Sequence, residues 1–296
     1  MKTIKNLQDH YVMYAMHVRP NTKKQTIYCS TKFVRELGHS LDDPIDEVLT
    51  KQNLLRFQRK SIEGASNCEE QNRKAISANS FVRMTRCLIS KRMQDTFDEP
   101  LPSQVYEFLN ARMLPQRMAS YSYDERKDAM RRLIDKMQTI KAEDPVLWAA
   151  YWLTMHCGLR RREAAFARWS WVSDKYLIVR PEADFVTKSG KSRKIPINQD
   201  DRAFVLSHRA ERTHILPGAY TNRYRTIFDK LAKLIRECGI KGTKSVHELR
   251  KYFGARVATD LSIFKAQRYL GHHSPELTNR LYADIIDDED DEIVIR

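Results

Sequence analysis

The spacing of apolar residues predicts helices throughout the first hundred residues. One face of a helix repeats every three or four positions, and near the start of the chain that repeat is formed by Leu7, Tyr11, Tyr14 and Val18. Pro44 opens another periodic stretch, which runs to about Ile62. Ser66 and Asn67 then predict the start of a long helix, because their side-chain oxygens accept hydrogen bonds from first-turn amides.

A group of prolines interrupts the helical pattern after the first hundred residues, at Pro100, Pro102 and Pro115. We therefore expect a linker between two domains, and 296 residues are enough for two domains that each bury a core. The predicted division is a helical domain at 1–100, a linker at 101–119, a second domain at 120–282 and a C-terminal tail at 283–296.

The second domain mixes helices with short strands. Helical periodicity covers 123–137 and 145–156, with Asp144 placed as a cap, and it returns over about 222–282. Three β-prone runs lie between these stretches, at 176–179, 184–187 and 194–197. The segment Lys188-Ser-Gly-Lys191 is typical of a hairpin connection between the last two runs. The predicted fold class is therefore mainly α with a small β-sheet in the second domain.

The charge of the chain favours a polyanionic partner over a membrane or an acidic small molecule. Lys and Arg outnumber Asp and Glu by 52 to 38, which leaves a net charge of +14. Residues 117–282 hold 33 basic and 18 acidic side chains, whereas 283–296 hold seven acids and one arginine. The basic charge therefore concentrates in the second domain. The acidic tail is equally typical of a solubilising segment and of a shield for a basic surface.

The cysteines and the apolar runs predict the cellular compartment of the protein. Five cysteines stand singly, without a CxxC pair or the Cys/His spacing of a zinc site, so we expect neither disulfides nor a structural metal. The N-terminus lacks the apolar core of a signal peptide, and no apolar run approaches the length of a membrane span. We expect a cytoplasmic protein that has no contact with a membrane.

Three short motifs, far apart in the sequence, carry the candidate chemistry. Cys157-Gly-Leu-Arg160-Arg-Arg-Glu163 places Arg160 at a turn, after a glycine that breaks the preceding helix. His247-Glu-Leu-Arg250 places a histidine and an arginine at one edge of the apolar stripe of a helix. Leu270-Gly-His272-His-Ser-Pro leads into a helix that carries Tyr282. Surface charge or packing explains each motif taken singly, so only their combination points to a function.

In order and separation these motifs resemble those of the tyrosine recombinase family, the phage-integrase type of site-specific DNA recombinases. The resemblance covers about 120–283 and includes a lysine in the hairpin. It implies a helical, SAM-like core-binding domain and a mixed α/β catalytic domain that together form a C-shaped clamp on double-stranded DNA. It also implies a homotetramer on two recombination sites, strand exchange through a Holliday junction, possible accessory DNA-bending or directionality factors, and a nucleoid-associated protein of prokaryotic or phage origin.

The resemblance implies a role for each site residue: Arg160 and Arg250 hold the scissile phosphate, Lys188 is the hairpin lysine, His247 and His272 are the two histidines, and Tyr282 is the nucleophile. Arginines suit a phosphodiester because their planar forks donate paired hydrogen bonds and stay charged. Tyrosine must lose its proton as it attacks, and His247 is the expected acceptor. Lys188 is the expected proton donor to the leaving 5′ oxygen, with Lys191 as the competing choice.

The same resemblance implies that no cofactor is needed. A covalent 3′-phosphotyrosine conserves the energy of the broken bond, so rejoining requires neither ATP nor a metal ion. Two acidic residues of the motifs, Glu163 and Glu248, are expected to support the neighbouring arginines. Further basic residues are expected to contact DNA, namely Arg73, Lys74, Arg83 and Arg86 on the long first-domain helix and Lys191 at the hairpin. For the helix residues alone, a solvated charged face is the simpler explanation.

Two alternatives use the same residues differently. A type IB topoisomerase-like or telomere-resolving enzyme has a similar tyrosine and phosphate clamp, but the compact bipartite chain argues against it. A DNA-binding regulator would keep the fold without catalysis, but all six site positions hold the expected residue types. The target sequence stays open, as does the choice between a phage or mobile-element integrase and a resolvase of DNA dimers.

Overall fold

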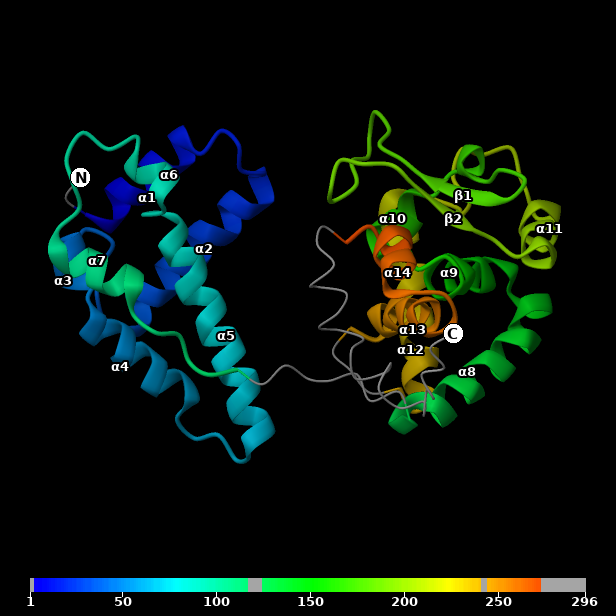
Figure 1. Cartoon of the computed structure of the whole chain (residues 1–296), viewed down its shortest axis with the longest axis horizontal. Coiled ribbons are helices and arrows are strands. Elements are labelled where there is room, and N and C mark those ends of the chain that lie inside the picture. The colour runs from blue at the N-terminus through cyan, green and yellow to red at the C-terminus, as the bar shows by residue number, and fades with distance from the viewer. Residues whose placement is uncertain (1–2, 117–123, 241–243, 273–296) are drawn as a thin grey trace, which may run out of the picture. The chain divides into compact units, whose positions relative to one another are not determined.

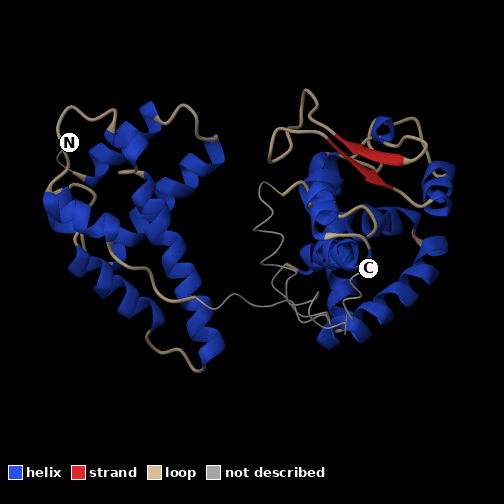
Figure 2. Ribbon diagram, in the orientation of Figure 1, coloured by secondary structure: helices blue, strands red, loops and turns tan. Residues whose placement is uncertain are grey.

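The computed structural model describes residues 3–116, 124–240 and 244–272, and it divides the chain into two compact units, Met1–Met118 and Ala119–Arg296. Each unit has an apolar core of its own. Helices make up most of both units, and a small sheet lies in the second (Figure 2). The predicted fold class is confirmed.

The described part of the first unit, residues 3–116, consists of helices joined by loops. Its helices are α1 (Ile4–Tyr14), α2 (Pro20–Glu36), α3 (Ile45–Val48), α4 (Lys51–Ile62), α5 (Cys68–Cys87), α6 (Lys91–Gln94) and α7 (Ser103–Asn110). Helices α2 and α5 lie side by side (Figure 1). Asn67 caps α5 as predicted, because its Oδ1 accepts a hydrogen bond from the amide of Glu70 at 2.8 Å.

Helix α7 lies where the prolines predict a linker. Its Val105 and Phe108 are buried in the core of the first unit, so this part of 101–119 belongs to that unit. Pro102 precedes the helix directly, and a proline at the start of a helix breaks no hydrogen bond, because the first amides have no partner within the helix. The pattern of prolines therefore marks the start of a helix as well as a break.

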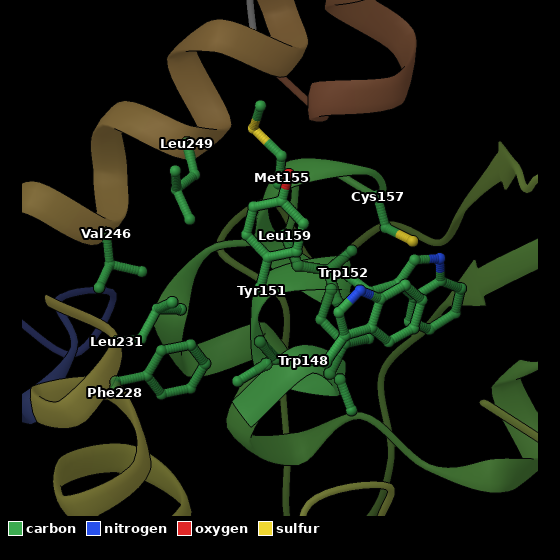
Figure 3. Close-up of a cluster of buried hydrophobic side chains, with 14 of the residues drawn as sticks. Trp148, Tyr151, Trp152, Met155, Cys157, Leu159, Phe228, Leu231, Val246 and Leu249 are labelled. Carbon is green, nitrogen blue, oxygen red and sulfur yellow. The ribbon is translucent and has the colours of Figure 1, made fainter. Parts of the chain in front are cut away.

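The second unit packs its helices around α9 (Pro145–Met155). Every residue of α9 from Trp148 to Met155 is buried, as expected for a helix that is apolar on all sides. Asp144 caps this helix as predicted, accepting a hydrogen bond from the amide of Leu147 at 3.0 Å. Figure 3 shows side chains of α9 facing Phe228 and Leu231 from one helix and Val246 and Leu249 from another. The other helices of this unit are α8 (Asp124–Glu143), α10 (Arg161–Phe166), a 3₁₀ turn (Trp169–Trp171), α11 (Gln199–Ser207), the π-helix η2 (Asn222–Thr226), α12 (Ile227–Glu237), α13 (Ser245–Asp260) and α14 (Ile263–Leu270).

The sheet of the second unit consists of two antiparallel strands, β1 (Tyr176–Val179) and β2 (Arg193–Pro196). Two of the three predicted strands are confirmed, but the middle run at 184–187 is not a strand and lies in the loop between β1 and β2. Its Phe185 is buried against Phe166 and Trp171, so the apolar residue of this run packs on helices and not in a ladder. The hairpin connection is therefore longer than predicted.

Candidate active site

A left-handed glycine sets the turn that leads from α9 to α10. Gly158 has φ +59°, and a Cβ atom at this position would lie 2.3 Å from Cδ1 of Phe253. Only glycine meets both conditions without strain. Arg160 follows with extended backbone as the residue that precedes α10. The predicted helix break at Gly158 and the predicted place of Arg160 at the next turn are both confirmed.

Glu163 is the centre of the site, and three arginines surround its buried carboxylate. Its Oε2 accepts a hydrogen bond from the amide of Arg160 at 2.9 Å, and its Oε1 accepts one from Nη1 of the same residue at 2.9 Å. Arg193 donates to both carboxylate oxygens, at 3.2 and 2.6 Å, and Nη1 of Arg250 lies 3.9 Å from Oε2. The expectation that Glu163 supports the local arginines is confirmed.

The charges around Glu163 decide its protonation. Burial by itself would raise the pKa of the carboxyl group, but the guanidinium of Arg193, with those of Arg250 and Arg160, lowers that pKa to about 2. The carboxylate is therefore ionised at neutral pH. Three arginines and one carboxylate leave two positive charges in a small volume, which favours an anionic ligand.

Arg250 ties three segments of the second unit together. It lies on α13, its side chain is only 2 % exposed, and it donates hydrogen bonds to the carbonyl oxygens of Gly158 and of Leu270, the latter at 2.6 Å. Those carbonyls belong to the turn before Arg160 and to the end of α14. The buried guanidinium therefore fixes the two other motifs relative to the helix that carries His247.

The two histidines flank Arg250 in the sequence, and their lowered pKa values leave both neutral at pH 7. His247 is exposed one turn before Arg250 and lines a cavity of about 540 Å³ together with Arg160. His272 is half-buried and follows Gly271, the left-handed residue that ends α14. Desolvation, followed by the positive charge of Arg250, lowers the pKa of each imidazole to about 4. Each ring is therefore able to accept a proton.

The hairpin lysines occupy different positions. Lys188 is exposed on a turn that is closed by two hydrogen bonds, from Gly190 N to Thr187 O at 3.1 Å and from Thr187 Oγ1 to Lys191 O at 2.9 Å. Lys191 lines a second cavity, of about 570 Å³, together with His272. Tyr282, the predicted nucleophile, lies outside the described residues, as does the acidic tail at 283–296.

The basic residues predicted on α5 do not form one group. Arg73 and Arg83 are exposed, whereas Lys74 donates to the carbonyl oxygen of Glu63 at 3.0 Å. Arg86 is half-buried, and its Nη2 donates to the carbonyl oxygens of Phe108 at 2.6 Å and Ala111 at 2.8 Å. Arg86 therefore holds the chain after α7 against α5, and the DNA contact expected for it stays a prediction.

Sequence analysis missed Arg193, although its position on a strand carried a signal. Arg193 lies in register with Val179, and it shares the face of β2 that buries Ile195, because side chains two positions apart point the same way. An arginine on a buried strand face requires a partner. Glu248, which is expected to support a neighbouring arginine, accepts a hydrogen bond from Nζ of Lys251 at 2.9 Å.

Comparison with protein families decides what kind of site this is. The sequence profile of the Phage integrase family matches residues 126–289, which is more than half of the chain. The chain belongs to the phage integrase family. This integrase is thus a tyrosine recombinase, an enzyme that breaks and rejoins DNA strands. Among curated proteins, none matches it.

Solved structures show the same fold at low sequence identity. The integrase is 17 % identical to lambda integrase 75–356, crystallised as a dimer on a core site, with 99 % of this chain and 100 % of that chain covered and a TM-score of 0.66. A lambda integrase tetramer on a Holliday junction is also 17 % identical, with 98 % and 80 % covered and a TM-score of 0.67. The Tn1549 transposon integrase with transposon right end DNA is 16 % identical, with 95 % and 94 % covered and a TM-score of 0.59.

The described residues of the integrase offer neither a metal-ligand cluster nor a membrane-spanning helix. In 3–116, 124–240 and 244–272, no cluster of three or more His, Cys, Asp or Glu side chains is placed to hold a metal ion. Over the same ranges, none of the helices combines the length and the apolar character that crossing a membrane requires.

Proposed function

We propose that this integrase cleaves one strand of a specific DNA site with Tyr282, forming a covalent 3′-phosphotyrosine. The observation that carries the proposal is the cluster of three arginines around the buried carboxylate of Glu163, with two neutral histidines beside it, in a chain of this family. In-line attack moves negative charge onto the non-bridging oxygens of the phosphate and onto its leaving oxygen. Fixed guanidinium groups stabilise that charge without reorganisation.

Arg160 and Arg250 hold the scissile phosphate in this proposal. Arg160 is the more accessible of the two, since its side chain is 26 % exposed and that of Arg250 is 2 % exposed. The phosphate therefore meets Arg160 first. Arg250 then donates to the phosphate as well as to the carbonyl oxygens of Gly158 and Leu270. One guanidinium can serve all these acceptors because it has five N–H donors.

Proton transfer falls to the histidines and the hairpin lysine. His247, neutral at pH 7, accepts the proton of the tyrosine hydroxyl as that oxygen bonds to phosphorus. Lys188, exposed on its turn, gives a proton to the leaving 5′ oxygen. His272 donates a hydrogen bond from its imidazole N–H to a phosphate oxygen. The step is balanced, because one P–O bond forms as another breaks and one proton is taken up as another is given.

Rejoining is the reverse reaction with a 5′ hydroxyl from a second strand, so we propose that neither ATP nor a metal ion takes part. Strand exchange then passes through a Holliday junction held by four copies of the chain. The solved lambda integrase tetramer on a Holliday junction supports this assembly by its similar fold. The lambda and Tn1549 matches favour a phage or mobile-element integrase. We propose that it acts on DNA in the cytoplasm.

The test is the formation of a covalent adduct on a nicked suicide substrate. The recombination site is first selected by binding from a random-sequence DNA library, and the protein is then incubated with a nicked duplex of that site in the presence of EDTA. A protein–DNA adduct that survives denaturing electrophoresis is expected for the wild type and for Tyr176→Phe, which changes an exposed tyrosine of β1. No adduct is expected for Tyr282→Phe.

Two results would contradict the proposal. If the wild type binds its site but forms no adduct, the protein is a regulator with a recombinase fold. If Tyr282→Phe still forms the adduct, another residue is the nucleophile. Relaxation of supercoiled DNA that lacks the selected site would instead favour a topoisomerase-like activity.

A further inference from the structure

Arg193 joins three segments of the second unit through one side chain. It is the first residue of β2, and its side chain is only 7 % exposed. Its Nε donates to the carbonyl oxygen of Tyr269 at 2.8 Å, and its two terminal nitrogens donate to the two oxygens of Glu163. A side chain with three directed hydrogen bonds and little exposure has its geometry fixed.

Each of the three segments carries a residue of the proposed chemistry. The loop that ends at β2 carries the hairpin lysines, Glu163 holds the backbone amide and guanidinium of Arg160, and Tyr269 lies three positions before His272. Arg193 and His272 also line the same cavity of about 570 Å³. The space beside them is tight, because a Cβ atom at Gly271 would lie 3.2 Å from Cδ of Arg193.

We propose that Arg193 is a positioning residue, which sets the hairpin loop, Arg160 and His272 in one fixed arrangement without touching the DNA itself. This inference rests on the proposed function of the site. Glu163 alone does not provide the link to β2 or to the end of α14, because both of those hydrogen bonds come from the guanidinium of Arg193. A shift of the reacting groups by about 1 Å lowers a reaction rate about a hundredfold.

Two substitutions separate the geometry of Arg193 from its charge. R193M removes both the charge and the hydrogen bonds, whereas R193K keeps a charge but replaces the planar fork by a point donor. The matched control is R202M, since Arg202 also bonds one carbonyl oxygen and one carboxylate, those of Ser173 and Asp174. Each variant is measured for binding of the selected DNA site and for the single-turnover rate of adduct formation on the suicide substrate at saturating protein.

The expected result is a loss of rate without a loss of binding. R193M should lower the adduct rate about a hundredfold and R193K about tenfold, with site affinity within about threefold of wild type. R202M should keep the wild-type rate even where it lowers stability. Retention of the wild-type rate in R193K and R193M would overturn the inference, and if R193M does not fold, the rate of R193K decides.

A second readout does not depend on catalysis. The imidazole of His272 is followed by NMR titration, with its signal assigned by its loss in H272Q. Desolvation is the main cause of the lowered pKa of this imidazole, and the charges of Arg250, Arg160, His247 and, as the smallest contribution, Arg193 lower it further. R193M should therefore shift its midpoint slightly upward, R193K should leave it nearly unchanged, and R202M should not move it. An unchanged midpoint in R193M would refute the placement of the Arg193 guanidinium beside His272. Because this titration needs no DNA, it judges the inference even if the wild type forms no adduct.

Discussion

The turn at Gly158 provides a sharp test of how this site is built, through the substitution Gly158→Ala. Two effects add at this position. The left-handed φ of +59° opposes any side chain by about 1–2 kcal/mol. In addition, the new Cβ atom would lie 2.3 Å from Cδ1 and 2.7 Å from Cε1 of Phe253, whereas two carbons prefer about 3.5–4.0 Å. The ring must therefore move by about 1 Å or more, which costs a further 1–3 kcal/mol, roughly, in packed surroundings.

A matched control isolates the second effect. Gly190 also has a left-handed backbone, with φ +73°, but a Cβ atom there would meet no atom within 4 Å. Gly190→Ala should therefore lower the free energy of unfolding by about 1–2 kcal/mol from backbone strain alone. The predicted difference between the two variants is then about 1–3 kcal/mol. The double variant Gly158→Ala/Phe253→Leu should regain part of that difference.

The assay is urea unfolding of the full chain followed by tryptophan fluorescence. The four tryptophans all lie in the second unit, namely Trp148, Trp152, Trp169 and Trp171. The signal therefore reports this unit alone. With a denaturant slope of about 2 kcal/mol per molar urea, Gly158→Ala should unfold at a urea concentration about 0.5–1.5 M below that of Gly190→Ala. Equal midpoints for the two variants, or no gain from Phe253→Leu, would refute the packing argument.

Three further predictions follow from charges and hydrogen bonds. The pKa of Glu163 is about 2 in the folded chain, below its ordinary value of 4.5. Its ionised form therefore adds about 3 kcal/mol to the free energy of unfolding above pH 4.5, and this stability is lost as the pH falls towards 2. Acid unfolding of Glu163→Gln should lack this dependence on pH. The imidazoles of His247 and His272 should titrate by NMR near pH 4, and midpoints near 6.5 would contradict the desolvation and the effect of Arg250 argued for them. Arg86→Met should lower the free energy of unfolding of the first unit by about 1–3 kcal/mol and leave the salt dependence of DNA binding unchanged. Arg83→Met should leave stability unchanged and lower the salt slope by about 1. The opposite pattern would show that Arg86, and not Arg83, contacts DNA.

Local signals in the sequence predicted the parts of the fold that depend on neighbouring residues. Asn67 and Asp144 cap helices because each needs only an amide two or three positions later. Gly158 turns the chain between α9 and α10 for an equally local reason, its left-handed backbone. The run at 184–187 was misjudged because the fate of Phe185 is decided by Phe166 and Trp171, and alternation along the chain does not contain that contact.

Local motifs in the sequence predicted four of the candidate site residues, but neither Arg193 nor the hydrogen bonds that join the motifs. The motifs predicted Arg160, His247, Arg250 and His272 because each of these residues has a fixed spacing from close neighbours in the sequence. Arg193 was missed because its partner Glu163 lies 30 positions earlier and meets it only after β2 has paired with β1. Long-range ion pairs of this kind have no local pattern, so they appear only once the strands and helices are placed.

The excess of positive charge around Glu163 links ligand binding to the stability of the fold. Arg160, Arg193 and Arg250 repel one another around a single carboxylate. Part of this repulsion is not neutralised in the folded chain, and a bound anion would reduce it. By mass action, any anion that occupies the cluster raises the melting temperature of the second unit, and it does so without any base pair being read. Sulfate or phosphate in a buffer therefore competes with DNA for Arg160 and Arg250 and also protects the protein. A thermal shift in such buffers measures how strongly the cluster attracts a phosphate, before any recombination site is known.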